Sequence, residues 1–248
     1  MKIILSVLIF ILVLTSCSQV GKSDSSIENN YYSTYDTHTD SIEEPKSIYL
    51  TQKDKNLISV QIPILDTNNF YTIKNNIVRY IGDYLFNLTD IEFQISETNN
   101  DLFKVLDENV AQYDYYIDIN YRIAMESKDC ISIIFEGMLN NRMAAHPIHL
   151  FFTYNVNPKT CERIVFSDMY HVDENLYNIV LLDVKEKIGD ERLENLLDEK
   201  SFLNGLSNEK DVFSYYTKDF VGISVPVPFS LGNHIEAEIP YNALRHNT

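Results

Sequence analysis

Residues 113–126 read YDYYIDINYRIAME, and every odd position in this stretch, from Tyr113 to Met125, carries an apolar or aromatic side chain. Most even positions are polar or charged, as at Asp114, Asp118 and Arg122. Side chains alternate between the two faces of a β-strand, so this period of two predicts a strand with one face in the core and the other in water. We expect the rest of the fold to form around this strand.

Two more strands are predicted directly after it. The odd positions of residues 131–139 are largely apolar again after the polar turn 127–129, a pattern typical of a hairpin. In residues 148–156 the apolar side chains fall on the even positions. The three segments predict one antiparallel sheet, in which residues 140–147 form a loop between the second and third strands.

A strand and a helix are predicted ahead of this sheet. Residues 57–65 alternate in the same way, and Pro63 indicates an edge strand because proline has no N–H to offer a neighbour. From Phe70 to about Phe86, apolar side chains recur every three to four residues, as expected of a helix that packs on the sheet. The polar residues 67–69 supply its N-terminal cap.

A second helix and three short strands complete the folded part. The helical period covers residues 176–188, is interrupted near Gly189 and continues to about Leu206. Three β-branched or aromatic segments follow, at residues 213–217, 223–227 and 235–239. The order strand, helix, antiparallel strands, helix, strands predicts an α+β fold, an antiparallel sheet with two main packing helices.

The first 16 residues resemble a bacterial lipoprotein signal peptide. Lys2 precedes an apolar stretch over residues 3–14, and Leu14-Thr15-Ser16-Cys17 resembles a lipobox. The stretch is too short for a good membrane span. The resemblance implies cleavage before Cys17 and lipidation of that cysteine; the alternative is an ordinary secretory signal. Either way, we expect the folded part to lie outside the cytoplasm. With the lipid anchor, it would lie in the cell envelope, on the extracytoplasmic side of a bacterial membrane.

The remaining chain divides into a tether and one α+β module. Residues 17–46 are rich in Ser, Asn, Asp and Thr without a sustained period, which predicts a flexible tether. Residues 47–126 and 127–248 form the two halves of the module. The net charge of −16 argues against nucleic acid and against protein contact with anionic lipid, so the membrane is reached through the lipid anchor only. This charge favours a cationic partner, or serves solubility alone.

Two cysteines remain once Cys17 is assigned to lipidation. Cys130 begins the second predicted strand and Cys161 follows the third, so antiparallel pairing brings both to the same end of the sheet. We predict a disulfide, which would contribute about 3–4 kcal/mol in the chain-entropy model. The alternative is two buried free thiols.

Candidate site residues lie in the loop before the third strand and on the last strand. His146, His149, Asp168 and His171 are the best polar cluster, but a spacing of three sends His146 and His149 to opposite strand faces, so no metal site is predicted. On the last strand, His234, Glu236 and Glu238 share one face, which suits a cation or basic partner, or simply water. The candidate ligand-binding residues are Arg142, His146, Asp168, His234 and Glu236.

No enzyme or cofactor motif is found. The chain has no G-x-S-x-G, H-E-x-x-H, Gly-rich phosphate loop or C-x-x-C pattern. No catalytic residue and no cofactor are predicted, although an acidic chain leaves room for a hydrolytic carboxylate pair.

Six short motifs occur in a recognisable order: VQIPIL at 60–65, SIIF at 132–135, AAH at 144–146, FSDMY at 166–170, GISVPVPF at 222–229 and EIPYNAL at 238–244. Together they resemble the extracytoplasmic domains found in lysozyme-sensing anti-sigma factors and beside some peptidoglycan deacetylases. Family members often have two glycines where this chain has Ala144 and Ala145. The resemblance covers roughly residues 47–245 and implies a stand-alone, lipid-anchored sensor or binding module.

Two functional hypotheses follow. The resemblance and the charge favour binding of a cationic, cell-wall-active protein such as lysozyme. The alternative is a cell-wall glycan binder or weak peptidoglycan-active enzyme that uses some of the 17 tyrosines, whose rings stack on sugars.

Overall fold

The computed structural model describes residues 47–53, 57–89, 93–94, 104–105, 115–141, 146–189 and 197–247. All of them belong to one compact unit, Glu44–Thr248. The predictions for the signal peptide, the tether, Cys17 and Arg142 lie outside the described residues. Among the described helices, none combines the length and the apolar character needed to cross a bilayer.

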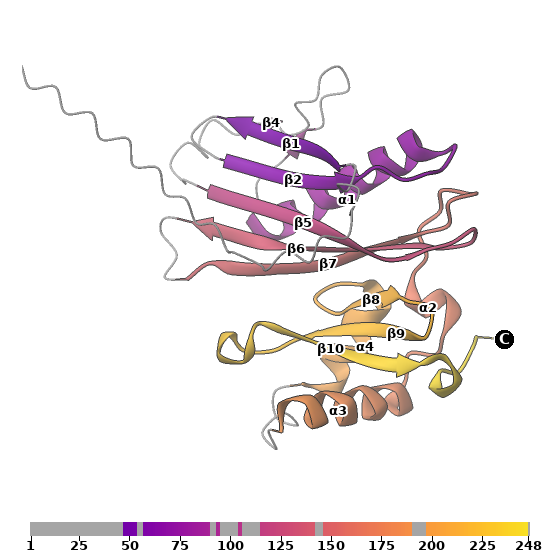
Figure 1. The fold of residues 1–248 in the computed structure, drawn as a ribbon. Coiled ribbons are helices and arrows are strands. Elements are labelled where there is room, and N and C mark those ends of the chain that lie inside the picture. The colour runs from indigo at the N-terminus through magenta and orange to yellow at the C-terminus, as the bar shows by residue number, and fades with distance from the viewer. Residues whose placement is uncertain are drawn as a thin grey trace, which may run out of the picture. The chain divides into compact units, whose positions relative to one another are not determined.

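The first sheet has five strands in the order β1-β2-β5-β6-β7 (Figure 1). Their bounds are β1 Ser47–Lys53, β2 Leu57–Pro63, β5 Tyr115–Glu126, β6 Ile131–Asn141 and β7 Ile148–Val156. The predicted β5-β6-β7 meander is confirmed as antiparallel, and the fold is α+β. β2 joins it in parallel with β5. A two-residue pairing, β3 Phe93–Gln94 with β4 Lys104–Val105, lies apart from this sheet.

The prediction that β2 is an edge strand was wrong. β1 pairs along the whole of β2 and occupies the edge instead. Pro63 is tolerated because it is the last residue of β2, and the pairing with β5 covers only Leu57–Val60. The missing N–H of Pro63 therefore removes no bond to β5.

Helix α1, Phe70–Thr89, covers one face of this sheet, as predicted from its apolar period. Its buried stripe includes Ile73, Ile77 and Ile81, and burial of one such side chain contributes about 1.5–3 kcal/mol. Asn69 ties the start of the helix to the turn after β7, because its side-chain amide donates to Pro158 O at 2.9 Å.

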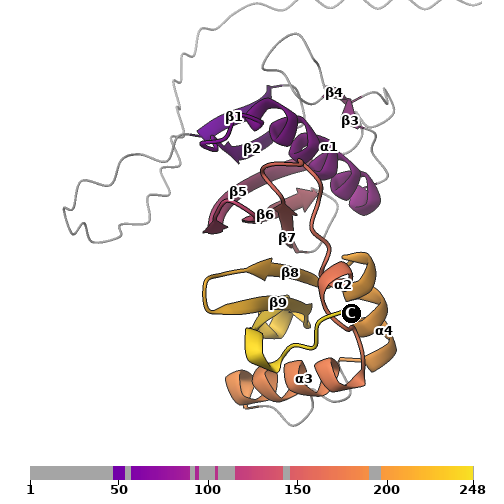
Figure 2. The same ribbon diagram turned by 90° about the vertical axis from the view of Figure 1, so that its right-hand side faces the viewer.

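The second sheet has three antiparallel strands in the order β10-β9-β8. Their bounds are β8 Phe213–Tyr216, β9 Phe220–Pro226 and β10 His234–Pro240. The helices α2 Phe166–Met169, α3 Glu174–Ile188 and α4 Glu199–Asn208 precede them. Helix α3 packs along β10 (Figure 1), and Figure 2 shows all three helices beside β8 and β9. Short 3₁₀ turns cover Phe229–Leu231 and Tyr241–Ala243.

The ends of α3 follow from its sequence. Asp173 caps the helix because its carboxylate accepts from Leu176 N at 3.1 Å. Gly189 ends it in a left-handed conformation, with φ 65°, which glycine adopts without steric cost. The interruption predicted near Gly189 is therefore a true helix end, and α4 is a separate helix.

The expected wet face of the central strands is only partly wet. Ser132, Thr153 and Asn155 point away from α1, yet all three are fully buried because β8 lies against them. Thr153 Oγ1 and Asn155 Nδ2 both donate to Ser214 O, at 2.6 and 2.8 Å. Ser132 Oγ accepts from Tyr216 N at 2.9 Å. Polar side chains thus join the two sheets. The alternating sequence pattern predicted that these positions are polar, but it did not predict that a second sheet covers them.

Cys130 and Cys161 are free thiols in the structure, so the predicted disulfide is not formed there. Cys130 packs against the hydrophobic cluster of the second sheet, and Cys161 packs against the cluster between α1 and the first sheet. Cys130 directly precedes β6 and Cys161 lies shortly after β7, so both are at the same end of the sheet. Their side chains nevertheless pack into different clusters. Burial raises the pKa of Cys130 to about 12, which keeps it a thiol.

Candidate functional site

The predicted cluster of His146, His149, Asp168 and His171 does not form a metal site. No three His, Cys, Asp or Glu side chains in the described part of the chain converge in a way that could hold a metal ion. His146 is exposed before β7, Asp168 is exposed on α2, and His171 uses its backbone N–H to donate to Arg245 O at 2.8 Å.

Glu236 on β10 contacts a cation from its own chain. Its Oε2 lies 2.9 Å from an Arg122 nitrogen, and Arg122 Nε lies 2.9 Å from Glu136 Oε1. Tyr215 Oη donates to the same Glu236 oxygen, and the Arg122 guanidinium lies 5.3 Å from the centre of the Tyr215 ring. These side chains are about one quarter to one half exposed, so each ion pair is worth only about 0.2–1 kcal/mol.

Gly222 makes room for this arrangement. It pairs with Tyr215 across β8 and β9, and a Cβ on Gly222 would lie 2.0 Å from the Tyr215 ring. The ring therefore lies flat over the glycine and aims its hydroxyl at Glu236. Burial, and then the hydrogen bond to Glu236, raise the pKa of Tyr215 above its ordinary value.

A buried ion pair stabilises the connection between α4 and the first sheet. The Glu209 carboxylate is 1% exposed and pairs with Arg163, whose guanidinium lies 4.2 Å from the centre of the Tyr80 ring. Ser214 Oγ also donates to Glu209 at 3.3 Å. These contacts make the pair structural, because the carboxylate is closed to any ligand.

His234 begins β10 and stacks on Phe151 of β7, with ring centres 4.3 Å apart. Its Nδ1 is buried and has no hydrogen-bond partner among the described residues, and its Nε2 lies 4.0 Å from Glu236 Oε1. Burial lowers the pKa of His234 below its ordinary value, against the pull of Glu236 and Glu136. The imidazole is therefore neutral near pH 7.

The same histidine lines a small hollow of about 180 Å³, named here the His234 hollow. Its described lining residues come from the C-terminal part of α1, β7 and the ends of β8 to β10: Tyr84, Leu88, Ile148, His149, Phe151, Asp211, Phe213, Ser224, Pro226, Asn233 and His234. None of these is Lys or Arg. Leu88 and Ile148 are 40% and 46% exposed, so the hollow has an open apolar rim.

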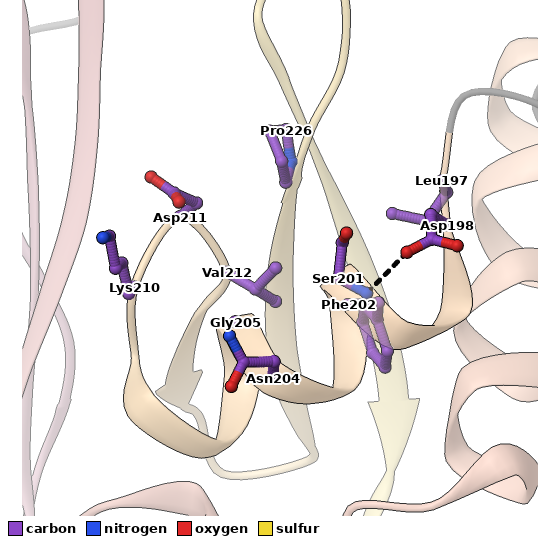
Figure 3. Close-up of a pocket in the computed structure, with 10 residues that line it drawn as sticks. All are labelled: Leu197, Asp198, Ser201, Phe202, Asn204, Gly205, Lys210, Asp211, Val212 and Pro226. Atoms are coloured by element: carbon purple, nitrogen blue, oxygen red, sulfur yellow. Dashed lines mark hydrogen bonds between the residues drawn. The ribbon is translucent and has the colours of Figure 1, made fainter.

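A second hollow of about 470 Å³, named here the α4 hollow, adjoins the first because Asp211 and Pro226 line both (Figure 3). Its described lining is Leu197, Asp198, Ser201, Phe202, Asn204, Gly205, Lys210, Asp211, Val212 and Pro226. Asp198 caps α4 by accepting from Ser201 N at 2.8 Å. Gly205 lets the following chain pack on the helix, since a Cβ there would lie 2.9 Å from Lys210 O.

Of the five candidate ligand-binding residues, Arg142 lies outside the described residues, and among the other four His234 is the one that lines a hollow described above, with Glu236 next to it. His149, from the predicted polar cluster, also lines the His234 hollow. Sequence reasoning missed Asp211 and Asn233, which also line the His234 hollow. Both have left-handed backbones, with φ 69° and 73°, a conformation that Asp and Asn tolerate better than other non-glycine residues. Asn233 follows Gly232, a turn signal that is visible in the sequence, whereas nothing marks Asp211.

No family model matches the chain, and no curated protein sequence matches it. Several solved structures are similar to it, including these two. One is a DUF3298 family protein from Pseudomonas aeruginosa PAO1, with 15% identity, a TM-score of 0.47, and 82% of this chain and 94% of that chain covered. The other is a DUF3298 family member from Bacteroides fragilis NCTC 9343, with 14% identity, a TM-score of 0.44, and 80% and 90% covered. Both neighbours are thus members of a domain-of-unknown-function family.

Proposed function

We propose that this chain is a lipid-anchored binding module on the extracytoplasmic side of a bacterial membrane, and that its ligand is a cationic, cell-wall-active protein such as lysozyme. Anchoring would be through Cys17, on the lipobox-like sequence around it. We choose a cationic ligand because of the distribution of charged side chains over the folded part.

Among the described residues, more carboxylates than cations lie outside ion pairs. The cations in ion pairs are Arg122, Lys159, Arg163, Lys187 and Arg245. Among the described residues, a further set of carboxylates has no ion-pair partner: Asp66, Glu126, Glu162, Asp168, Asp211 and Asp219. Since the net charge is −16, the surface carries an uncompensated negative field, which speeds association with a cationic protein.

Titration of the chain from Ser18 onward with lysozyme tests this proposal. We expect binding that weakens between about 20 and 150 mM salt, because the Debye length shortens over this range. The soluble chain is suitable because Glu44–Thr248 forms one compact unit. Absence of binding at a concentration on the order of tens of micromolar would remove lysozyme as the ligand.

The alternative is a glycan binder or a weak peptidoglycan-active enzyme. Among tyrosines whose side chains are described, only Tyr71 and Tyr116 are exposed, at 76% and 41%, so few rings are open for stacking on sugars. The α4 hollow does carry two carboxylates, Asp198 and Asp211, and most glycoside hydrolases need such a pair. Sedimentation with insoluble peptidoglycan at high salt tests binding, and loss of turbidity of a peptidoglycan suspension tests hydrolysis.

A further inference from the structure

The His234 hollow combines an apolar wall with a carboxylate, that of Asp211, which has no cationic partner among the described residues. We propose that this hollow takes one lysine or arginine side chain of a cationic protein partner, with the aliphatic stem against the wall and the charged head at Asp211. The proposal rests on the proposed function for the identity of the partner. It goes further in naming the place of contact and the chemical group that enters.

The wall suits an aliphatic stem. Leu88 and Ile148 expose 40% and 46% of their surface at the rim, and Tyr84 and Pro226 line the same space. Lysine and arginine bury their methylene stems along apolar surface while the charged head stays in a polar setting. A volume of about 180 Å³ is smaller than the roughly 300–1,000 Å³ of a typical small-molecule site, so one side chain is a better fit than a whole metabolite.

The charge of the lining suits a cationic head. Asp211 forms no ion pair or hydrogen bond with its side chain in the described part of the chain, and Lys210 beside it lines only the α4 hollow. The Asp211 charge acts on Tyr84: burial, then Tyr80 and then Asp211 raise the pKa of the Tyr84 phenol above its ordinary value. A cation in the hollow would therefore meet both a free carboxylate and an aromatic ring, the two groups that attract it.

The backbone holds the polar rim in place. Asp211 and Asn233 are two of the four described non-glycine residues with positive φ, and both line this hollow. A left-handed backbone costs a non-glycine residue free energy, so the surrounding structure must over-determine both positions. Both residues thus bring a polar side chain to the hollow from a bend in the chain.

Small probes test the hollow without any protein partner. Nα-acetyl-lysine methylamide and its arginine counterpart, added to the chain from Ser18 onward, are expected to shift the amide NMR signals of Asp211 and Asn233 with a dissociation constant on the order of millimolar. The norleucine counterpart has the same stem without the charge, and we expect it to bind about threefold more weakly because it forms no ion pair with the exposed Asp211 carboxylate. No shift with the basic probes, or equal binding of the norleucine probe, would overturn the proposal. A shift of the same signals by triacetylchitotriose and not by the basic probes would overturn it in favour of a glycan.

Matched variants connect the hollow to the protein partner. Asp211→Asn keeps a residue that accepts positive φ, and Asp219→Asn in the β8-β9 turn makes the same charge change elsewhere. Ile148→Ser and Leu182→Ser remove exposed apolar side chains inside and outside the hollow. We expect Ile148→Ser to weaken lysozyme binding about tenfold, because a buried apolar contact can be a hot spot. Asp211→Asn should weaken it about threefold, because Asp211 is exposed. The two controls should change it by less than about 1.5-fold.

The experiments distinguish a failure of the proposed function, that lysozyme is the ligand, from a failure of the assignment of the His234 hollow. If lysozyme binds the native chain and all four variants equally, the hollow is not the contact and the inference is overturned, while the proposed function stands. If lysozyme does not bind but the basic probes shift Asp211 and Asn233, lysozyme is excluded as the ligand and the assignment of the hollow is supported.

Discussion

The carbonyl oxygen of Ser214 is the acceptor on which the contact between the two sheets converges. It is buried, and it accepts from Thr153 Oγ1 at 2.6 Å and from Asn155 Nδ2 at 2.8 Å. Either donor alone satisfies this oxygen. Loss of one donor should therefore be tolerated, whereas loss of both leaves a buried carbonyl without a partner.

The magnitudes follow from which groups are left unpaired. Thr153→Val removes one of the two bonds to Ser214 O and should cost about 0.5–1.5 kcal/mol. Asn155→Leu also takes away the acceptor of Ser132 Oγ, which lies 2.6 Å from Asn155 Oδ1, so it should cost about 1–3 kcal/mol. The double variant should exceed the sum of the two by about 1–2 kcal/mol, the penalty for the orphaned Ser214 carbonyl.

Urea unfolding followed by far-ultraviolet circular dichroism measures these free energies, provided that the m-value is unchanged. As a control, Thr217→Val removes a hydroxyl that donates to Phe220 O at 2.7 Å and shares no partner with Asn155. Its combination with Asn155→Leu should be additive within about 0.5 kcal/mol. If the combination of Thr153→Val with Asn155→Leu is equally additive, the two donors do not share an acceptor and the description of the sheet contact is wrong.

Three further predictions concern single residues. Gly222→Ala places a methyl group 2.0 Å from the Tyr215 ring and should destabilise the fold by about 1–3 kcal/mol in the same urea assay; an unchanged midpoint would contradict the close approach. Because burial lowers the pKa of His234 in the folded state, its contribution to stability is present above the unfolded pKa near 6.5 and is lost as pH falls through the folded pKa. The stability of His234→Gln should therefore depend less on pH below about 6.5 than that of the native chain, and parallel profiles would refute this. Finally, Cys17→Ser should abolish incorporation of labelled fatty acid in cells, and retained label would exclude Cys17 as the lipidation site.

The sequence was sufficient to predict the strands β5, β6 and β7, because apolar side chains recur at every second position in each of them. In β5, Ile117 and Ile119 are buried as their odd positions predicted, whereas Ile123 is 40% exposed beside a bulge that shifts the register between Ile123 and Met125. In β6 and β7, the polar positions Ser132, Thr153 and Asn155 are buried too, because β8 lies against them. β1 was not predicted as a strand, and its presence moved β2 away from the edge. A pattern of alternating residues reports which face is apolar, but it does not report which strand lies beside which.

The hollows could not be predicted in the same way, because they arise where elements distant in sequence end side by side. Leu88 closes α1, Ile148 opens β7 and Asn233 precedes β10, yet they line one space. His234 was singled out only because it shares a strand face with Glu236. This strand face was expected to be open to a cation, a basic partner or water. In the structure, Glu236 pairs with Arg122 and the His234 ring packs on Phe151.

Side chains bond to the backbone at both edges of the three-stranded sheet. Some of the charged residues that make up the net charge are therefore engaged within the fold. At β10, Lys187 Nζ donates to Glu236 O at 2.8 Å, and Asp183 accepts from Glu238 N at 3.2 Å. At β8, Thr153 and Asn155 donate to Ser214 O, and Ser132 Oγ accepts from Tyr216 N. Open edges invite pairing with other chains, so these residues protect the fold. Charges such as Asp183 and Lys187 therefore serve the architecture, and only carboxylates left free of it, Asp211 above all, remain to attract a cationic partner.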